Sequence, residues 1–257
     1  MNNTFYPKKS LGQNFLCDPN IIRKIVGVIA PQQGNTIVEI GPGNGALTDY
    51  LVGKCKELIL IEKDEQLVQN LQVKYGSYEQ VSIFHGDILT MEWQPFLPAD
   101  KIVGNLPYNI SSQILFAVYH HASHLREAIF MVQKEVALRL VAKPSTKEYG
   151  IMTVLTPLYG KAEILFHIPP TVFFPRPKVN SSLIKIYLTP DIHKDIEDKE
   201  FFHHLVRTAF NQRRKTLRNS LKTLIGAQQI SDIDLGLRAE ALSFEDFKRL
   251  YHHLKEN

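Results

Sequence analysis

The tetrapeptide Asn105-Leu106-Pro107-Tyr108 could hold a difficult nucleophile, the exocyclic amino group of a purine base. The lone pair of that nitrogen is delocalised into the ring. The amide oxygen of Asn105 and a backbone carbonyl of the turn could accept its two hydrogens and free the lone pair. Pro107 has no N–H and fixes φ, so the turn offers carbonyls without a competing donor. Tyr108 supplies a flat ring against a base pulled out of its stack. An ordinary strand-to-helix turn would also fit these four residues alone.

A glycine-rich turn, residues 41–45, follows the apolar run 36–40 and precedes an expected helix. We expect its glycines to leave N–H groups free at the helix N-terminus. The spacing is G-x-G-x-G, whereas a dinucleotide site needs G-x-G-x-x-G. Pro42 also removes one N–H that a pyrophosphate would use. The turn therefore favours a cofactor that has no phosphate at this loop.

Two acidic residues end the next two predicted strands. Glu62 can accept hydrogen bonds from both hydroxyls of a ribose. Asp87 can accept a hydrogen bond from an adenine amino group. Either acid alone could equally be a helix cap. With the glycine turn and Asn105, four successive strand ends carry chemistry that suits an uncharged nucleoside with a zwitterionic tail.

The elements that position these groups alternate along the chain. Apolar runs rich in β-branched residues predict strands at 36–40, 58–61, 81–84, 101–103 and 128–132, and helical patterns fall at 46–52, 64–74, 111–120 and 133–142. This alternation predicts an α/β fold with a Rossmann-like, doubly wound parallel sheet, with ligands at the carboxyl ends of the strands. Residues 163–167 and 183–188 are expected to add an antiparallel hairpin at one edge, with an irregular loop between them.

The charged stretch 189–199 contains a proline and predicts a domain boundary, with a first domain at 1–189 and a helical domain at 190–257. Ser243 and Asp246 resemble a capping box that opens the last helix. Basic residues recur there at spacings of seven, four and four, namely Arg207, Arg214, Arg218 and Lys222. A continuous helix would place them on one stripe, although a break near residues 211–212 is plausible. The stripe is either a solvated surface or a contact for RNA phosphates; Arg176, Lys178, Lys8 and Lys9 would extend such a footprint.

The composition sets limits on the function. The net charge of +4 and the pI of about 8.9 favour an anionic partner. Two cysteines give no disulfide framework and fit a reducing cytoplasm. No Cys/His spacing suits zinc, so no metal is expected, and no apolar run reaches the ~18 residues of a membrane span. We expect a cytoplasmic monomer.

Specific motifs, in addition to those above, lie at residues 9–16, 39–48, 173–181 and 209–217. With Glu62, Asp87 and residues 105–108, they make the chain resemble the ribosomal RNA adenine N6,N6-dimethyltransferase family over nearly its whole length. The resemblance implies S-adenosylmethionine as methyl donor. It also implies dimethylation of two adjacent adenosines in the 3′-terminal hairpin loop of 16S rRNA in the immature 30S subunit, and a role in small-subunit biogenesis.

By motif match, the cofactor residues are Asn14 and Leu16 on the methionine side, Gly41 in the glycine turn, Glu62 at the ribose, Asp87 at the adenine and Asn105 at the end that meets the target. Phe173 is predicted to cover the second face of the flipped adenine, opposite Tyr108, and Phe174 to pack in the core. Other readings stay open: a DNA adenine N6-methyltransferase, a ribosome-assembly factor that mainly binds RNA, and, third, a nicotinamide oxidoreductase.

Overall fold

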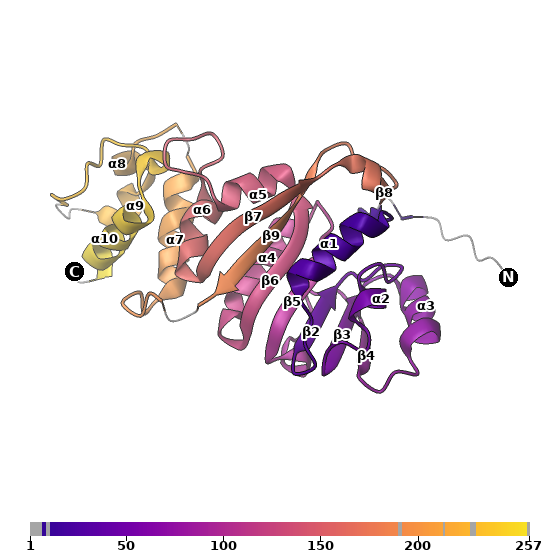
Figure 1. Cartoon of the computed structure of the whole chain (residues 1–257). Coiled ribbons are helices and arrows are strands. Elements are labelled where there is room, and N and C mark those ends of the chain that lie inside the picture. The colour runs from indigo at the N-terminus through magenta and orange to yellow at the C-terminus, as the bar shows by residue number, and fades with distance from the viewer. Residues whose placement is uncertain (1–6, 9–10, 190–191, 213, 227–229, 256–257) are drawn as a thin grey trace. The chain divides into compact units, whose positions relative to one another are not determined.

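The computed structural model describes residues 7–8, 11–189, 192–212, 214–226 and 230–255 (Figure 1). The chain forms two compact units, Met1–Ala137 with Glu163–Leu188, and Leu138–Ala162 with Thr189–Asn257. The predicted boundary at 189/190 lies one residue after the third crossing between these units, at 188/189. Residues 138–162, which the sequence placed in the first domain, group with the C-terminal helices instead. Nothing in the sequence of residues 138–162 indicates which unit they pack against, so their unit is known only from the contacts in the structure.

The first unit contains a seven-stranded sheet in the order β4-β3-β2-β5-β6-β9-β7. Strands β2 to β6 are parallel to one another, and β9 is antiparallel to β6. The doubly wound sheet and its antiparallel addition at one edge are thus confirmed. The strand bounds are β2 (Thr36–Ile40), β3 (Glu57–Glu62), β4 (Val81–His85), β5 (Ala99–Asn105), β6 (Leu125–Gln133), β7 (Gly160–Ile168) and β9 (Ser181–Leu188).

Helices alternate with these strands along the chain. They are α1 (Pro19–Ile29), α2 (Thr48–Leu51), α3 (Glu65–Tyr75), α4 (Ser111–His120) and α5 (Lys134–Leu140). Asp18 caps α1 by accepting the N–H groups of Asn20 and Ile21. The helix predicted at 46–52 is shorter, since the glycine turn continues to residue 47. Asp64 caps α3 directly after the tip of β3.

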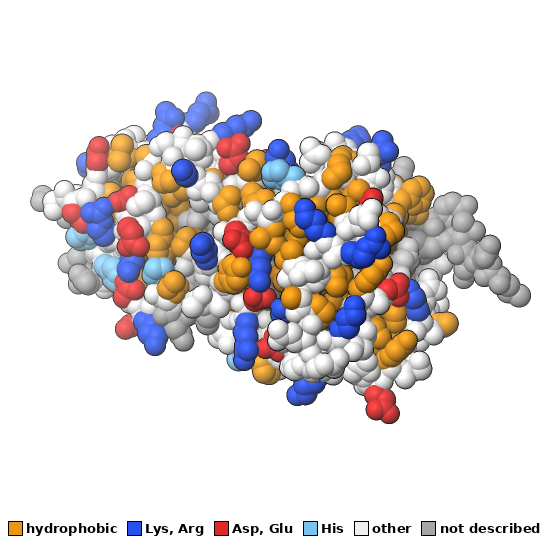
Figure 2. All heavy atoms as spheres, in the orientation of Figure 1, with side chains coloured by type: hydrophobic (Ala, Val, Ile, Leu, Met, Phe, Trp, Pro, Cys, Tyr) orange, Lys and Arg blue, Asp and Glu red, His pale blue; other side chains and the backbone are white. Residues whose placement is uncertain are grey.

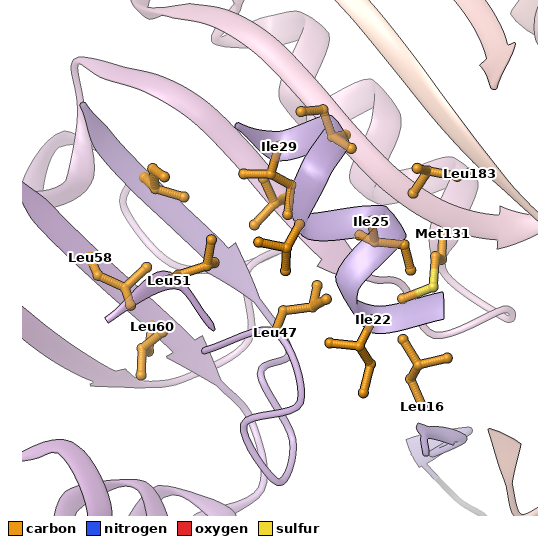
Figure 3. Packing of buried hydrophobic residues seen from close by; sticks show 14 of the residues in the cluster. Leu16, Ile22, Ile25, Ile29, Leu47, Leu51, Leu58, Leu60, Met131 and Leu183 are labelled. Carbon is orange, nitrogen blue, oxygen red and sulfur yellow. The ribbon is translucent and has the colours of Figure 1, made fainter. Parts of the chain in front are cut away.

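The core that supports these ends lies between α1 and the sheet (Figure 3). One face of α1 points Ile22, Ile25 and Ile29 toward the sheet, and all three are buried. Burial of each such side chain contributes about 1.5–3 kcal/mol, which fixes the helix on the strands. Leu58 and Leu60 of β3 and Leu47 and Leu51 around α2 belong to the same cluster.

A second sheet of two short strands joins distant parts of the first unit. β1 (Phe15–Leu16) pairs antiparallel with β8 (Phe173–Phe174). The sequence predicted an irregular loop at 169–178, because two-residue strands have no periodicity to detect. The pairing brings the N-terminal motif beside the Phe-Phe-Pro loop.

The second unit is helical, apart from the start of β7. Its helices are α6 (Ile151–Leu155), α7 (Lys199–Phe210), α8 (Leu217–Ser220), α9 (Lys222–Ile225) and α10 (Phe244–Lys255). The capping box is confirmed: Ser243 N donates to Asp246 Oδ2 at 2.7 Å, and Asp246 N donates to Ser243 Oγ at 3.2 Å. Within the described ranges, no helix is long and apolar enough to cross a membrane.

Candidate functional site

A pocket of about 160 Å³ opens at the carboxyl ends of β2, β3, β4 and β5 in the first unit. It contains all four strand-end groups that the sequence singled out. Its principal lining residues are Leu11, Gly12, Gln13, Asn14, Phe15, Gly41, Gly43, Ile61, Glu62, Lys63, Asp87, Ile88, Asn105, Leu106, Pro107, Tyr108 and Asn109. The sheet therefore brings together segments that are far apart in the sequence, from the N-terminal residues to the start of α4.

The glycine turn forms one wall of the pocket in a left-handed conformation. Gly41, Gly43 and Gly45 have φ values of 63°, 59° and 85°. A Cβ on Gly43 would lie 2.9 Å from the Phe15 ring, and one on Gly45 would lie 2.1 Å from Tyr75 Oη. Gly41 has no atom within 4 Å of its Cβ position, so a side chain there would project into open space.

The N–H groups of this turn are engaged within the protein. Gly41 N donates to the carbonyl of Ile61 at 2.9 Å, Gly43 N to Glu62 Oε2 at 3.1 Å and Gly45 N to the carbonyl of Pro42 at 2.9 Å. The expectation of free N–H groups at a helix N-terminus is wrong for these three. Gly41 N and Gly43 N hold the turn against β3, and Gly45 N closes the turn on itself, so none of the three is left for a phosphate.

Glu62 is a buried carboxylate fixed by backbone. Its Oε1 accepts the N–H groups of Lys63 and Asp64, each at 2.9 Å, and its Oε2 accepts Gly43 N. Burial raises the pKa of Glu62 more than these three N–H groups lower it. Each carboxylate oxygen can accept about two hydrogen bonds. One acceptor position therefore remains, on Oε2, in a rigid group at the edge of the pocket.

Asp87 lies in the turn after β4 and forms an ion pair with Lys63, which follows β3. Lys63 Nζ lies 2.7 Å from Asp87 Oδ2, and Leu89 N donates to Oδ1 at 3.0 Å. Partial burial acts to raise the pKa of Asp87, but the Lys63 ammonium and the Leu89 N–H bring it below its usual value. The carboxylate is therefore charged at neutral pH.

Asn105 ends β5 and is oriented by the N-terminal segment. Its Nδ2 donates to the carbonyl oxygen of Asn14 at 2.7 Å. A planar amide held by its nitrogen presents its oxygen on the opposite side. Within the described part of the chain, Asn105 Oδ1 accepts no hydrogen bond. An acceptor is thus available in the pocket.

The backbone of the turn after Asn105 is held by two hydrogen bonds. Ile110 N donates to the carbonyl of Pro107 at 3.2 Å, so that oxygen is partly engaged. Leu106 N donates to the carbonyl of Met131, which holds the turn on β6. Leu106 lines the pocket, so its carbonyl is the candidate backbone acceptor of the tetrapeptide.

Tyr108 is half-buried with its hydroxyl fixed. Tyr108 Oη is hydrogen-bonded to Ser181 Oγ, at the start of β9. Burial raises the pKa of Tyr108, and the Ser181 bond opposes that rise only in part. The phenol is therefore neutral, and its ring stands beside Asn105 as part of the pocket wall.

The structure does not bring Phe173 or Leu16 to the pocket. They are paired in register between β8 and β1, and they are 4% and 6% exposed. A ring packed in this core cannot also cover a base, so the stacking role predicted for Phe173 is not supported. The expectation that Phe174 packs in the core is wrong, since it is 63% exposed. Adjacent strand residues point to opposite faces, and the sequence could not tell which faces inward.

Glu39, in β2, is a second buried acid close to the glycine turn. It is 2% exposed, below the glycine turn, and accepts the Thr48 hydroxyl at 2.7 Å. Burial raises its pKa to about 7, with Glu62 and Asp49 adding to the shift and the Thr48 bond opposing it. It does not line the pocket, and its place is in the support of the turn.

The basic residues of the predicted stripe lie on separate elements of the second unit. Arg207 is in α7, Arg214 in the following turn, Arg218 in α8 and Lys222 in α9. The break near residues 211–212 is confirmed, and the single continuous stripe is wrong. Arg176 and Lys178 lie beside Phe174 in the loop between β8 and β9 of the first unit. In the face turned to the viewer in Figure 2, Lys and Arg side chains are spread among apolar ones. Lys9 lies outside the described residues.

Comparison with known proteins identifies the family. The chain matches the family model described as "Ribosomal RNA adenine dimethylase" over residues 4–256. This chain belongs to that family. Proteins named "Ribosomal RNA small subunit methyltransferase A" are similar to it along almost their whole length. The one from Chlorobium chlorochromatii is 45% identical, covering 96% of this chain and 94% of the relative. The one from Pseudomonas aeruginosa is 37% identical, covering 97% and 95%.

Solved structures agree on the fold. A dimethyladenosine transferase from Plasmodium falciparum has a TM-score of 0.80 at 24% identity, covering 94% of this chain and 98% of its own. The 23S rRNA methyltransferase ErmE has a TM-score of 0.66 at 24% identity, covering 94% and 99%. This member of the family therefore has the Rossmann-like methyltransferase fold that its sequence predicts.

Proposed function

We propose that this protein transfers methyl groups from S-adenosylmethionine to the N6 amino groups of two adjacent adenosines in the 3′-terminal hairpin loop of 16S rRNA. The substrate would be the immature 30S subunit, and the modification would belong to small-subunit biogenesis. The names of its relatives support the ribosomal substrate. The observation that carries the chemistry is the amide of Asn105, fixed by Asn14 with its oxygen available beside Tyr108.

The residues present fit the methyl donor. Gly41 leaves open space where a side chain would stand, and Glu62 retains an acceptor position for the ribose. Asp87 would accept the adenine amino group, and Asn14 would contact the methionine side. Leu16, which the motif also suggested, would act through the β1–β8 pairing and not by contact. No group of three or more His, Cys, Asp or Glu in the described residues could hold a metal.

The side chains would act by orientation and by accepting charge. When bound, the donor supplies an electrophilic methyl group on a sulfonium. Asn105 Oδ1 and the Leu106 carbonyl would accept the two N6 hydrogens, and the freed lone pair would form the new N–C bond as the C–S bond breaks and its electrons return to sulfur. The extra proton on the product nitrogen would leave to water. Orientation of this kind can supply about 7–11 kcal/mol of the barrier.

The experiment is to incubate the protein with radiolabelled S-adenosylmethionine and unmethylated 30S subunits, and then to map the labelled nucleosides. Label in two neighbouring N6,N6-dimethyladenosines near the 3′ end of 16S rRNA is expected. A parallel incubation with adenine-containing duplex DNA tests the alternative substrate. Label in the DNA but not in the subunits would replace the proposal with a DNA methyltransferase, and tight 30S binding without methyl transfer would replace it with an assembly factor. Omitting the subunits gives the background.

A further inference from the structure

One wall of the pocket lies outside the seven-stranded sheet and the helices that follow its strands. Residues 11–15, here called the N-terminal wall, all line the pocket from outside the strand tips. The Phe15 ring lies against the glycine turn, where a Cβ on Gly43 would come within 2.9 Å. Gly12 lies against the turn after β5, where its Cβ would come within 3.1 Å of Asn109 Oδ1. The wall therefore reaches both the cofactor side and the base side of the pocket.

The buried carboxylate of Asp64 holds the N-terminal wall through Gln13, which is in the wall, and through Lys8, which precedes it. Lys8 Nζ lies 2.6 Å from Asp64 Oδ1, and Gln13 Nε2 donates to Asp64 Oδ2 at 3.0 Å. Gln13 Oε1 in turn accepts Lys8 N at 2.7 Å, which closes a ring of contacts. The Asp64 side chain has no exposed surface, whereas the Lys8 side chain is 46% exposed.

Asp64 is held ready for this contact by its own strand and helix. Its Oδ1 also accepts Gln66 N at 3.1 Å, as the cap of α3, and its own N–H donates to Glu62. Burial acts to raise its pKa, but Lys8, Gln13 and the Gln66 N–H bring the pKa below its usual value. A charged carboxylate without these partners would be costly at a buried position.

We infer that Asp64 is a positioning residue that clasps the N-terminal wall over the bound methyl donor and thereby sets how fast the donor and its product leave. The same tip of β3 carries Glu62 into the pocket and Asp64 onto the wall, two residues apart. The wall in turn holds Asn105 through the Asn14 carbonyl. This inference rests on the proposed function, since it takes the occupant of the pocket to be the methyl donor.

The test removes the two side chains that contact Asp64 and leaves the Asp64 cap of α3 intact. In the Lys8→Ala/Gln13→Ala double variant, the dissociation rate of S-adenosylhomocysteine, followed by stopped flow, should rise about tenfold, which corresponds to about 1.4 kcal/mol. The KM for the donor should rise by a similar factor. The KM for the donor should change by a larger factor than kcat, because the clasp acts on donor binding and reaches Asn105 only through Asn14.

Two matched variants separate the clasp from a general loss of charge. Lys74→Ala removes a surface pair with Asp49 on a side chain that is 47% exposed, close to the exposure of Lys8, and should leave the dissociation rate unchanged. Lys8→Arg, made in the wild-type protein, keeps a positive charge at Asp64 and should retain slow dissociation. An unchanged rate in the double variant, or a loss of kcat with a native KM, would overturn the inference. A wild-type protein that binds no S-adenosylhomocysteine would instead overturn the proposed function.

Discussion

The strand tips of the first unit and the basic residues of the second unit meet their proposed ligands in different ways. At the tips, each polar group has a fixed partner: Glu62 has three N–H groups, Asp87 has Lys63, and Asn105 has Asn14. Arg214, Arg218 and Lys222 are exposed on three short elements. A preorganised site stabilises one geometry, whereas exposed charges give affinity without fixed geometry. Single changes at the tips should therefore be severe, and those in the helical unit gradual.

The largest effect is expected for Asn105→Ala. It removes the preorganised acceptor for the N6 amino group, so kcat should fall about 100-fold or more, as for other preorganised polar groups. Donor binding should weaken only modestly, since the other strand tips remain. Single-turnover methylation of 30S subunits, together with calorimetry of S-adenosylhomocysteine, measures both. A near-native rate would remove Asn105 from its assigned role.

Glu62→Gln should come next and act on binding alone. Hydrogen bonds to charged groups contribute about 1.5–3 kcal/mol, so the Kd for S-adenosylhomocysteine should rise by about 10- to 100-fold. Calorimetry provides the value, and a thermal melt of the same sample checks that the three N–H contacts of Glu62 have not cost the fold. An unaltered Kd in a folded variant would place the ribose elsewhere.

Two variants of Tyr108 separate the contribution of its ring from that of its hydroxyl. Stacking on a base is worth about 1–3 kcal/mol, so Tyr108→Ala should lower kcat/KM for the 30S subunit by about tenfold or more. Tyr108→Phe loses only the Ser181 bond and should retain much of the activity. Equal losses in the two variants would mean that the hydroxyl is the working group.

The smallest effect is expected in the helical unit. Replacing both Arg214 and Arg218 by alanine should flatten the dependence of log K on log salt by about 0.7–0.9 for each phosphate that the variant no longer neutralises. Binding of 30S subunits across a salt series measures the slope. If the slope stays at the wild-type value, these arginines do not contact phosphate, and the contrast between the two units loses its electrostatic half.

The sequence predicts the strand tips well because buried β-branched runs have clear limits, and the residue directly after each run must lie at the edge of the sheet. Glu62, Asp87 and Asn105 were found in this way. Sequence patterns do not show which of two adjacent apolar residues is buried, and they do not show contacts between residues that are far apart in the sequence. Phe173 and Phe174 alternate across a two-residue strand, so their exposures were exchanged. The clasp on Asp64 joins residues 51 and 56 positions apart, and no local pattern signals it.

The helical unit was predicted least well, for a related reason. The spacing of its basic residues assumed one continuous helix, but α7 ends at Phe210 and α8 begins only at Leu217. Leu217 N and Arg218 N donate to the carbonyls of Leu237 and Leu235, so the geometry there depends on a distant segment of the chain. Periodicity along the sequence cannot register such contacts.

The most direct test is a crystal structure of the protein with S-adenosylhomocysteine and adenosine 5′-monophosphate. The account predicts the ribose of the product at Glu62, its adenine at Asp87, and the N6 of the second base within hydrogen-bond distance of Asn105 Oδ1. A product bound away from the tips of β2 to β5, or an Asn105 side chain turned from the second base, would contradict it.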